Sequence, residues 1–156
     1  MLISITGSTG TGKTSVGKLL AKRLGYKFIS LNKLAERKNL YCGYDKKRKC
    51  RIVDIGRVGK ELEKTKNIYK NIVIESHYSH YIQSDLSVVL RCNPKELEKR
   101  LQERRWKKDK IKENIEAEIM EICLSDAMGY RKLVIVIDTT GKQPEVCVKE
   151  IVNKLE

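Results

Sequence analysis

The residues best suited to chemistry form the stretch GSTGTGKT at residues 7–14. It fits the spacing G-x-x-x-x-G-K-[ST] and lies between an apolar run, residues 2–5, and a helix-like run, residues 15–24. Gly10 and Gly12 free the backbone to adopt conformations that a Cβ disfavours, so successive N–H groups can converge on one anion. The alternative is a chance match in a turn, but a strand before and a helix after argue against it. The stretch therefore predicts a phosphate-binding loop.

Two side chains of this loop indicate that the anion is a nucleoside triphosphate. Lys13 would place a positive charge beside the β- and γ-phosphates, and Thr14 would offer a hydroxyl to Mg²⁺. The helix that follows adds the positive end of its dipole. The loop alone leaves open which molecule, water or another, accepts the γ-phosphate.

Two more candidates follow the apolar run at residues 72–74. Glu75 stands at its tip, where nucleotide-binding proteins of this class place a carboxylate that orders the water shell of Mg²⁺. His77 could position or deprotonate an attacking group, because imidazole titrates near neutrality. The alternatives are an ordinary acid at a strand end and a structural histidine in a turn. His80 has no such context, and we expect it to serve packing or to face solvent.

A cluster of cations at residues 104–108, Arg-Arg-Trp-Lys-Lys, joins two expected helices. A flap that bears arginine would bring positive charge over the transferred phosphoryl group and keep water out. A basic, exposed joint between helices is the equal alternative. Arg91, at the end of another apolar run, is a second candidate phosphate ligand, and residues 140–144 lie at the edge where the base of a nucleotide would bind.

The composition describes a charged, single-domain protein. The chain has 156 residues, of which 40% are hydrophobic and 34% charged. The net charge of +13 attracts polyanions such as nucleotides and RNA, although a solvated Lys- and Glu-rich surface explains it equally well. Five scattered cysteines without a C-x-x-C pair predict reduced, mostly buried thiols and no metal site. No apolar run is long enough to span a bilayer and no leader is present, so we expect a cytoplasmic protein without membrane contact.

Apolar spacing predicts helices and strands in alternation, which is typical of an α/β fold with right-handed crossovers. The runs at residues 86–90 and 133–137 are continuously apolar, as suits the centre of a parallel sheet covered on both faces. Asn93 and Pro94 predict the start of a helix. One long helix is predicted by a stripe of isoleucines, Ile111, Ile115, Ile119 and Ile122. Residues 39–51 lose periodicity and predict a mobile, basic insertion.

Several motifs together resemble one known family. The loop at residues 7–14, the Leu-Ala and Leu-Tyr-x-Gly-Tyr-Asp of residues 34–45, Glu75-x-His77, Leu90-Arg91, Arg104-x-Trp106 and residues 114–119 occur in the order seen in the adenylate kinase isoenzyme 6 family. The chain looks like an archaeal-type member over nearly its whole length. The resemblance implies a P-loop NTPase fold of the nucleoside monophosphate kinase type, with a five-stranded parallel sheet flanked by helices. Residues 1–156 would form a single domain, with a monophosphate-binding flap at residues 30–53 and a lid at residues 103–113.

The resemblance also implies roles for single residues. ATP would be bound by Gly10, Gly12, Lys13, Thr14 and Ser15, with Arg104 closing from the lid and Lys142 or Gln143 beside the adenine. Mg²⁺ would be held by Thr14 and Glu75. The catalytic residues would be Lys13, Glu75, His77 and Arg104, with the acid-x-His pair linked to ATP hydrolysis.

Three departures from the family pattern concern the flaps. Arg105 stands where the family usually has Gly after the lid arginine, and would stiffen the lid or add a phosphate contact. Asn32-Lys33 replaces the Gly-Asp that precedes Leu-Ala. Glu36 occupies the place of an arginine that would grip the α-phosphate of the acceptor, with Arg37 one residue later, so the choice of monophosphate is the feature least defined by the motifs.

The resemblance implies transfer of the ATP γ-phosphate to AMP or another nucleoside monophosphate, with ATPase activity and a role in rRNA maturation of the small ribosomal subunit. The partners would be the platform protein of that subunit, number eleven in the universal naming, and nearby rRNA. The first alternative is an ATPase assembly factor of pre-ribosomes in which kinase activity is secondary. A kinase for a small metabolite, of the shikimate kinase type, is a weaker alternative, because residues 39–51 and the acid-x-His pair argue against it.

Overall fold

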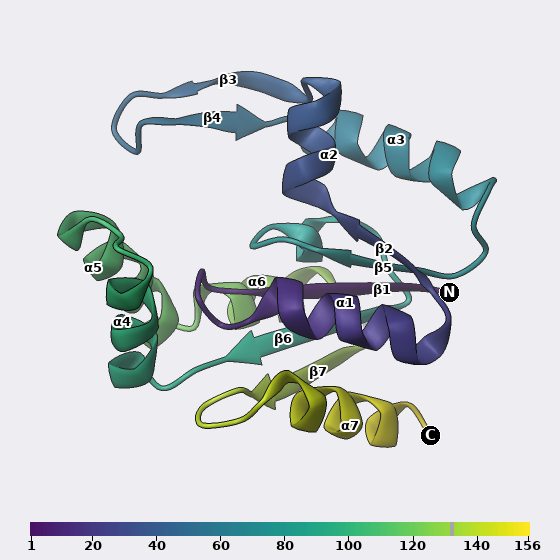
Figure 1. The fold of residues 1–156 in the computed structure, drawn as a ribbon. Helices are drawn as coiled ribbons and strands as arrows, with labels where there is room; N and C mark the ends of the chain where they lie inside the picture. The colour runs from purple at the N-terminus through teal and green to yellow at the C-terminus, as the bar shows by residue number, and fades with distance from the viewer. Residues whose placement is uncertain (132) are drawn as a thin grey trace.

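A five-stranded parallel sheet forms the centre of the computed structural model, which describes residues 1–131 and 133–156 (Figure 1). The strands lie in the order β2-β5-β1-β6-β7. Their bounds are Leu2–Gly7 for β1, Lys27–Ser30 for β2, Ile72–Glu75 for β5, Leu86–Arg91 for β6 and Val134–Asp138 for β7. Neighbouring strands are parallel and alternate with helices along the chain, which confirms the expected α/β class.

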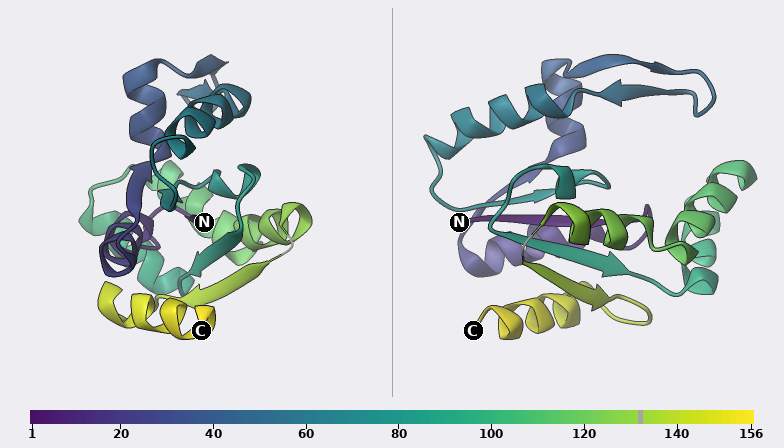
Figure 2. Two further views of the ribbon diagram at one scale, coloured as in Figure 1. Left: turned by 90° about the vertical axis from the view of Figure 1, so that its right-hand side faces the viewer. Right: turned by 180° about the vertical axis from the view of Figure 1, so that it is seen from behind.

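Helices pack on both faces of this sheet and form two hydrophobic cores (Figure 2). α1 (Lys13–Leu24) and α7 (Pro144–Leu155) share one core with Ile3 and Ile5 of β1. α2 (Leu31–Lys38) and α3 (Ile55–Lys66) share the other with Ile72 and Ile74 of β5. Because successive side chains of a strand point to opposite faces, the continuous apolar runs of the central strands supply both cores.

β7 lies at the edge of the sheet, so the central position predicted from its apolar run is wrong. Val136 of β7 is 40% exposed and Leu133, just before this strand, is 56% exposed, in keeping with a strand that pairs with β6 alone among the described strands. Helices α6 (Ile122–Tyr130) and α7 pack against β7 and account for its apolar content. β6 is an inner strand, as predicted, and its residues 86–90 are buried.

Most of residues 39–51, predicted as an irregular insertion, belong to an antiparallel hairpin of β3 (Tyr41–Asp45) and β4 (Cys50–Val53). The Asp45 carboxylate accepts a 3.0 Å hydrogen bond from the Arg48 N–H, which closes the turn. The sequence did not predict strands because most residues of both are exposed, so neither face requires alternating apolar residues. Figure 1 shows the hairpin projecting over the sheet toward the side where α5 lies.

α4 (Pro94–Glu103) begins where the sequence predicts. The Asn93 side-chain oxygen accepts a 2.9 Å hydrogen bond from the Lys95 N–H and caps the helix. A short 3-10 turn, η1 (Ser79–Tyr81), follows β5.

The single long helix predicted from Ile111 to Ile122 is wrong. α5 (Lys108–Ile119) ends before the chain turns at Glu121, whose φ of 56° is left-handed, and α6 begins at the next residue. Ile111 is 7% exposed, whereas Ile119 is 60% exposed. The buried stripe therefore stops at the break, which isoleucine spacing alone could not reveal.

The cysteines are unpaired, as expected, but less buried than predicted. Cys92 and Cys147 are buried and Cys123 is half-buried, whereas Cys42 and Cys50 are exposed on the hairpin. Within the described part of the chain, none of the helices combines the length and apolar character needed to cross a membrane.

Candidate phosphate-binding site

The loop between β1 and α1 has the backbone that phosphate binding requires. Gly10 and Gly12 have φ of 91° and 97°, in the region that disfavours a side chain. A Cβ at Gly10 would lie 2.9 Å from Leu97 Cδ1 of α4, closer than packed carbon atoms approach. Gly12 directly precedes α1, so the free N–H groups of the first turn of α1 border the loop. Both positions thus favour glycine, because their backbone conformation disfavours a side chain and Gly10 also has no room for a Cβ.

Lys13, Thr14 and Glu75 meet at the carboxyl ends of β1 and β5. Glu75 is aligned with Ile5 in the pairing of these strands, which places it beside the loop. Thr14 Oγ1 donates a 3.3 Å hydrogen bond to Glu75 Oε1. Lys13 Nζ donates one of 3.0 Å to the Ser8 carbonyl. A hydroxyl and a carboxylate are oxygen donors of the kind that Mg²⁺ accepts alongside water, so these residues fit the metal.

Opposing influences set the charge of Lys13. Burial lowers its pKa to about 8, and the Glu75 carboxylate acts in the opposite direction. The Arg104 guanidinium also lowers the pKa of Lys13, which places Arg104 within electrostatic range of the loop. Ser15, on the first turn of α1, is exposed. An anion bound in the loop would stabilise the charged form of Lys13.

His77 is exposed on the turn after β5. Partial loss of hydration, together with the Lys13 ammonium, lowers the pKa of His77 to about 4. The ring is therefore neutral at pH 7 and offers a nitrogen lone pair. His80 is 2% exposed, and its Nδ1 lies 2.7 Å from Thr6 Oγ1, which assigns it to packing.

Arg104 caps the end of α4, and the chain then turns through Arg105, whose φ is 57°. The Arg105 N–H donates to the Gln102 carbonyl at 2.9 Å, and the Trp106 N–H donates to the Leu101 carbonyl at 3.2 Å. These bonds form a Schellman motif, in which the left-handed residue after the helix is usually glycine. The motif therefore accounts for the glycine that the family resemblance leads us to expect in place of Arg105. Arg105 adopts the same conformation at a cost in backbone strain.

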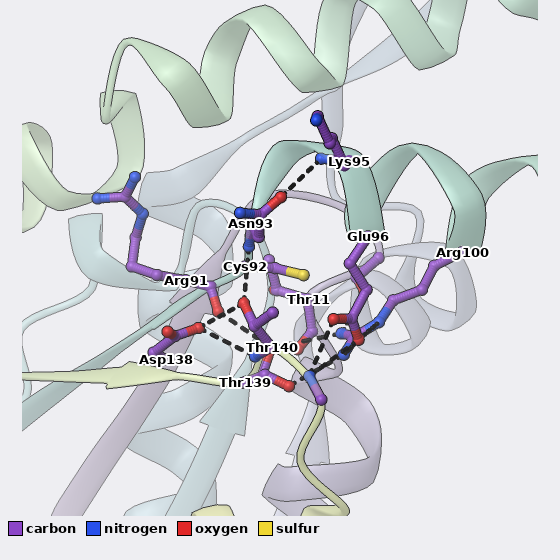
Figure 3. Close-up of polar contacts among 12 residues, drawn as sticks. Thr11, Arg91, Cys92, Asn93, Lys95, Glu96, Arg100, Asp138, Thr139 and Thr140 are labelled. Carbon is purple, nitrogen blue, oxygen red and sulfur yellow. Dashed lines mark hydrogen bonds and ion pairs between the residues drawn. The ribbon is translucent and has the colours of Figure 1, made fainter.

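A polar network that the sequence did not predict supports the loop from the side of α4 and β7 (Figure 3). Thr139 Oγ1 lies 3.0 Å from the Thr11 carbonyl oxygen. Arg100 donates to the Thr139 carbonyl at 3.0 Å and is paired with Glu96. Glu96 in turn accepts a 2.9 Å hydrogen bond from the Gly141 N–H. The network joins the loop, α4 and the segment after β7, where the base of a nucleotide is expected.

Two other candidates, Lys142 and Arg91, already have ion-pair partners. Lys142 Nζ lies 2.8 Å from Glu150 of α7, and Gln143 directly precedes that helix. The Arg91 guanidinium pairs with Glu118 and with Glu121, at the junction of α5 and α6. Arg91 is therefore neutralised by carboxylates instead of being directed at the loop. Glu118 belongs to the motif at residues 114–119, but no role could be assigned to it from the sequence, because its contacts come from segments distant along the chain.

Known proteins resemble this chain throughout its length. Residues 3–121 match a family model described as "AAA domain". Proteins named "Putative adenylate kinase" from Thermococcus kodakarensis and Pyrococcus furiosus are 40% and 42% identical, and each match covers 98% of this chain and 84% and 83% of the relative. A protein of the same name from Methanocaldococcus jannaschii is 36% identical, with 100% of this chain and 86% of the relative covered.

Solved structures share the fold. A shikimate kinase from Bacteroides thetaiotaomicron has a TM-score of 0.63 at 18% identity, covering 99% of this chain and 98% of that one. A deoxyadenosine kinase from M. mycoides has a TM-score of 0.62 at 18% identity, with the same coverage. These similarities confirm a P-loop kinase fold of the nucleoside monophosphate kinase type, and at this identity they bear on the fold alone.

Proposed function

Because the chain belongs to the family of P-loop nucleoside monophosphate kinases, we propose that it transfers the γ-phosphoryl group of ATP to AMP or another nucleoside monophosphate. The observation that carries this function is the meeting of Lys13, Thr14 and Glu75 at the loop, with 3.3 Å between the Thr14 hydroxyl and the Glu75 carboxylate. The name of a relative 40% identical to this chain supports AMP as the acceptor.

The residues would act through position and charge, without a covalent enzyme intermediate. Backbone N–H groups of the loop bind the phosphates, and Lys13 leaves the Ser8 carbonyl to neutralise the β- and γ-oxygens. Mg²⁺, held by Thr14 and Glu75, would supply further positive charge to the phosphates. Arg104 adds charge from the lid, and closure excludes the water that competes with the acceptor.

We assign the acceptor flap to residues 30–53 and the lid to residues 103–113. The first contains α2 and the β3–β4 hairpin, and the second contains the end of α4 and the first half of α5. Arg48 Nε lies 3.2 Å from a Glu113 carboxylate oxygen, and Lys110 Nζ donates to the Arg48 carbonyl at 2.8 Å. This contact supports a substrate site enclosed between the two flaps.

We assign ATP hydrolysis to the same site, with His77 as the residue that holds the attacking water. The lowered pKa of His77, about 4, supports this role because a neutral ring can accept a hydrogen bond from water at pH 7. The remaining ATP contacts would come from Ser15 on α1 and from Lys142 or Gln143 beside the adenine.

A second candidate function is that of an ATPase assembly factor for the small ribosomal subunit in the cytoplasm. The observation that favours it is the exposed positive charge of the hairpin, contributed by Lys46, Lys47, Arg48, Lys49 and Arg51. Such a projecting cationic segment suits a polyanion such as rRNA. The platform protein of that subunit would then be the protein partner.

Measurement of ATP consumption separates the two functions. A kinase consumes ATP in proportion to added AMP or another monophosphate and produces the matching diphosphate. An assembly ATPase consumes ATP without a monophosphate and is stimulated by the platform protein or its rRNA site. Consumption that responds to neither addition would contradict both functions.

A further inference from the structure

Glu118 is a buried charged residue close to the end of α5. Its side chain is 2% exposed, and it lies one residue before the end of the helix. Ser8 Oγ donates a 2.7 Å hydrogen bond to Glu118 Oε2, and the Cys92 N–H donates one of 3.2 Å to Oε1. Arg91 Nε pairs with the same Oε1 atom. An ionised carboxylate can remain buried because it has several donors and an opposite charge.

Arg91 holds the backbone of the same junction. Its Nη2 donates to the Glu118 carbonyl at 3.0 Å, and its Nη1 pairs with Glu121 at 2.8 Å. Glu121 is the left-handed residue between α5 and α6. Arg91 and Glu118 thus attach the C-terminal end of α5 to the end of β6, an inner strand of the sheet.

Ser8 links this junction to the phosphate-binding loop. Its hydroxyl binds Glu118, while its carbonyl accepts a 3.0 Å hydrogen bond from Lys13 Nζ and a 2.8 Å hydrogen bond from Thr11 Oγ1. A phosphate in the loop draws the Lys13 ammonium away from this carbonyl, because the ammonium pairs more strongly with an anion than with a neutral oxygen. The surroundings of Ser8 therefore differ between the empty and the occupied loop.

The other end of α5 belongs to the lid. This helix begins at Lys108, directly after the joint that carries Arg104 and Trp106. It is a continuous helix of 12 residues, so a change in direction at its C-terminal end moves its N-terminal end.

We propose that Glu118 is a positioning residue that couples the occupancy of the loop, sensed through Ser8, to the orientation of α5 and therefore of the lid. This role rests on the proposed function, because it requires that the loop bind the phosphates of ATP. A purely structural Glu118 would stabilise the junction equally in the empty and the nucleotide-bound protein. Coupling predicts instead that breaking the Ser8–Glu118 hydrogen bond weakens the lid response to nucleotide.

The test uses the full chain and the Mg²⁺ complex of a non-hydrolysable ATP analogue. Trp106 is the sole tryptophan of the sequence, and as a lid residue that is 39% exposed it reports closure through its fluorescence. Calorimetry gives the dissociation constant of the analogue. The variants are Ser8→Ala, Glu118→Gln and the double variant. Ser4→Ala is the matched control, because Ser4 is a buried serine of β1 whose hydroxyl lies 3.1 Å from the Ser87 hydroxyl, away from the loop.

Ser8→Ala should weaken binding of the analogue about tenfold, because coupling requires that the Ser8–Glu118 hydrogen bond stabilise the occupied loop more than the empty one. It should also lower the Trp106 response at saturation by roughly half, because the lid no longer follows the loop. The double variant should bind the analogue no more weakly than Glu118→Gln does, since the two substitutions break the same Ser8–Glu118 hydrogen bond. Ser4→Ala should bind the analogue as the unmodified protein does.

Unchanged affinity and a full Trp106 response in Ser8→Ala would overturn the coupling. It would also be overturned if the fold-changes in dissociation constant of Ser8→Ala and Glu118→Gln multiply in the double variant. If Glu118→Gln does not fold, the Trp106 response of Ser8→Ala decides. Binding of the analogue requires no acceptor, so a failure of phosphoryl transfer alone leaves the test intact. An unmodified protein that does not bind the analogue would overturn both the coupling and the proposed kinase function.

Discussion

Thr14 Oγ1 donates a 3.3 Å hydrogen bond to Glu75 Oε1, which joins the first turn of α1 to the end of β5. These residues are 61 positions apart in the sequence and meet because β5 pairs directly with β1. The proposed function assigns this hydroxyl and carboxylate to Mg²⁺ next to the phosphates.

Glu75→Gln should reduce the apparent affinity for Mg²⁺ and the turnover number by about 10- to 100-fold, because the amide keeps the shape of the side chain but lacks its charge. Turnover measured across a Mg²⁺ titration gives both values. The control is Asp85→Asn, because Asp85 accepts a hydrogen bond from the Leu2 N–H and lies away from the loop. Equal Mg²⁺ dependence in Glu75→Gln and the unmodified protein would exclude Glu75 from the metal site.

The rate should depend on the protonation of Lys13. Its pKa in the free protein is lowered from 10.5 to about 8, so the ammonium loses its proton as the pH rises through 8. The value of kcat/KM for ATP should therefore fall above pH 8, whereas kcat should persist to higher pH because bound phosphates stabilise the ammonium. In Lys13→Arg the charge persists at all these pH values, so any remaining activity should lack this decline.

The lowered pKa of Lys13 also makes the stability of the fold depend on pH. Between pH 8 and 10.5 the unfolded chain binds more protons at Lys13 than the folded chain does, so this residue makes the free energy of unfolding rise with pH over that range. Urea denaturation at a series of pH values, compared between the unmodified protein and Lys13→Met, isolates this contribution. A contribution of the opposite sign would show that Lys13 is not desolvated.

His77→Ala should reduce hydrolysis of ATP without AMP much more than transfer to AMP, since AMP brings its own nucleophile into line. With a pKa of about 4, His77 stays neutral from pH 7 down to pH 5, so hydrolysis should lose the contribution of His77 only as the pH approaches 4. Product analysis by chromatography, with and without AMP, measures both reactions. Equal losses in the two reactions would make His77 structural.

Arg105→Gly should stabilise the protein by about 0.5–1 kcal/mol. The left-handed conformation, with φ of 57°, costs a side-chain-bearing residue about 1–2 kcal/mol, and glycine offsets part of this gain by its greater freedom in the unfolded chain. Arg105→Ala is the matched control, because it removes the guanidinium but keeps the Cβ, and it should bring no such gain. Thermal and urea denaturation provide the measurement, and equal stability of the two variants would refute the strain.

Local signals predicted the loop, the position of Glu75 at a strand end and the start of α4 at Asn93, because each depends on neighbouring residues. The hairpin was missed because its exposed strands lack an apolar alternation. The break at Glu121 was missed because isoleucine spacing does not report a left-handed residue.

The long-range hydrogen bonds that hold the phosphate-binding loop in place could not be predicted from the sequence. Arg100 approaches the Gly10 carbonyl from 90 residues away, and Ser8 meets Glu118 across 110 residues. Such contacts depend on strand order and helix placement, which composition and spacing leave undetermined.

The most direct test of the kinase function is AMP-dependent formation of ADP from Mg²⁺–ATP, measured with the unmodified protein and with Lys13→Ala. We predict that AMP stimulates ATP consumption and that one AMP and one ATP yield two ADP. Lys13→Ala should remain folded and lose about 100-fold or more of this rate, because a charge that stabilises the transition state is removed. ATP consumption that ignores AMP and other monophosphates, or near-normal turnover in Lys13→Ala, would contradict the proposed function.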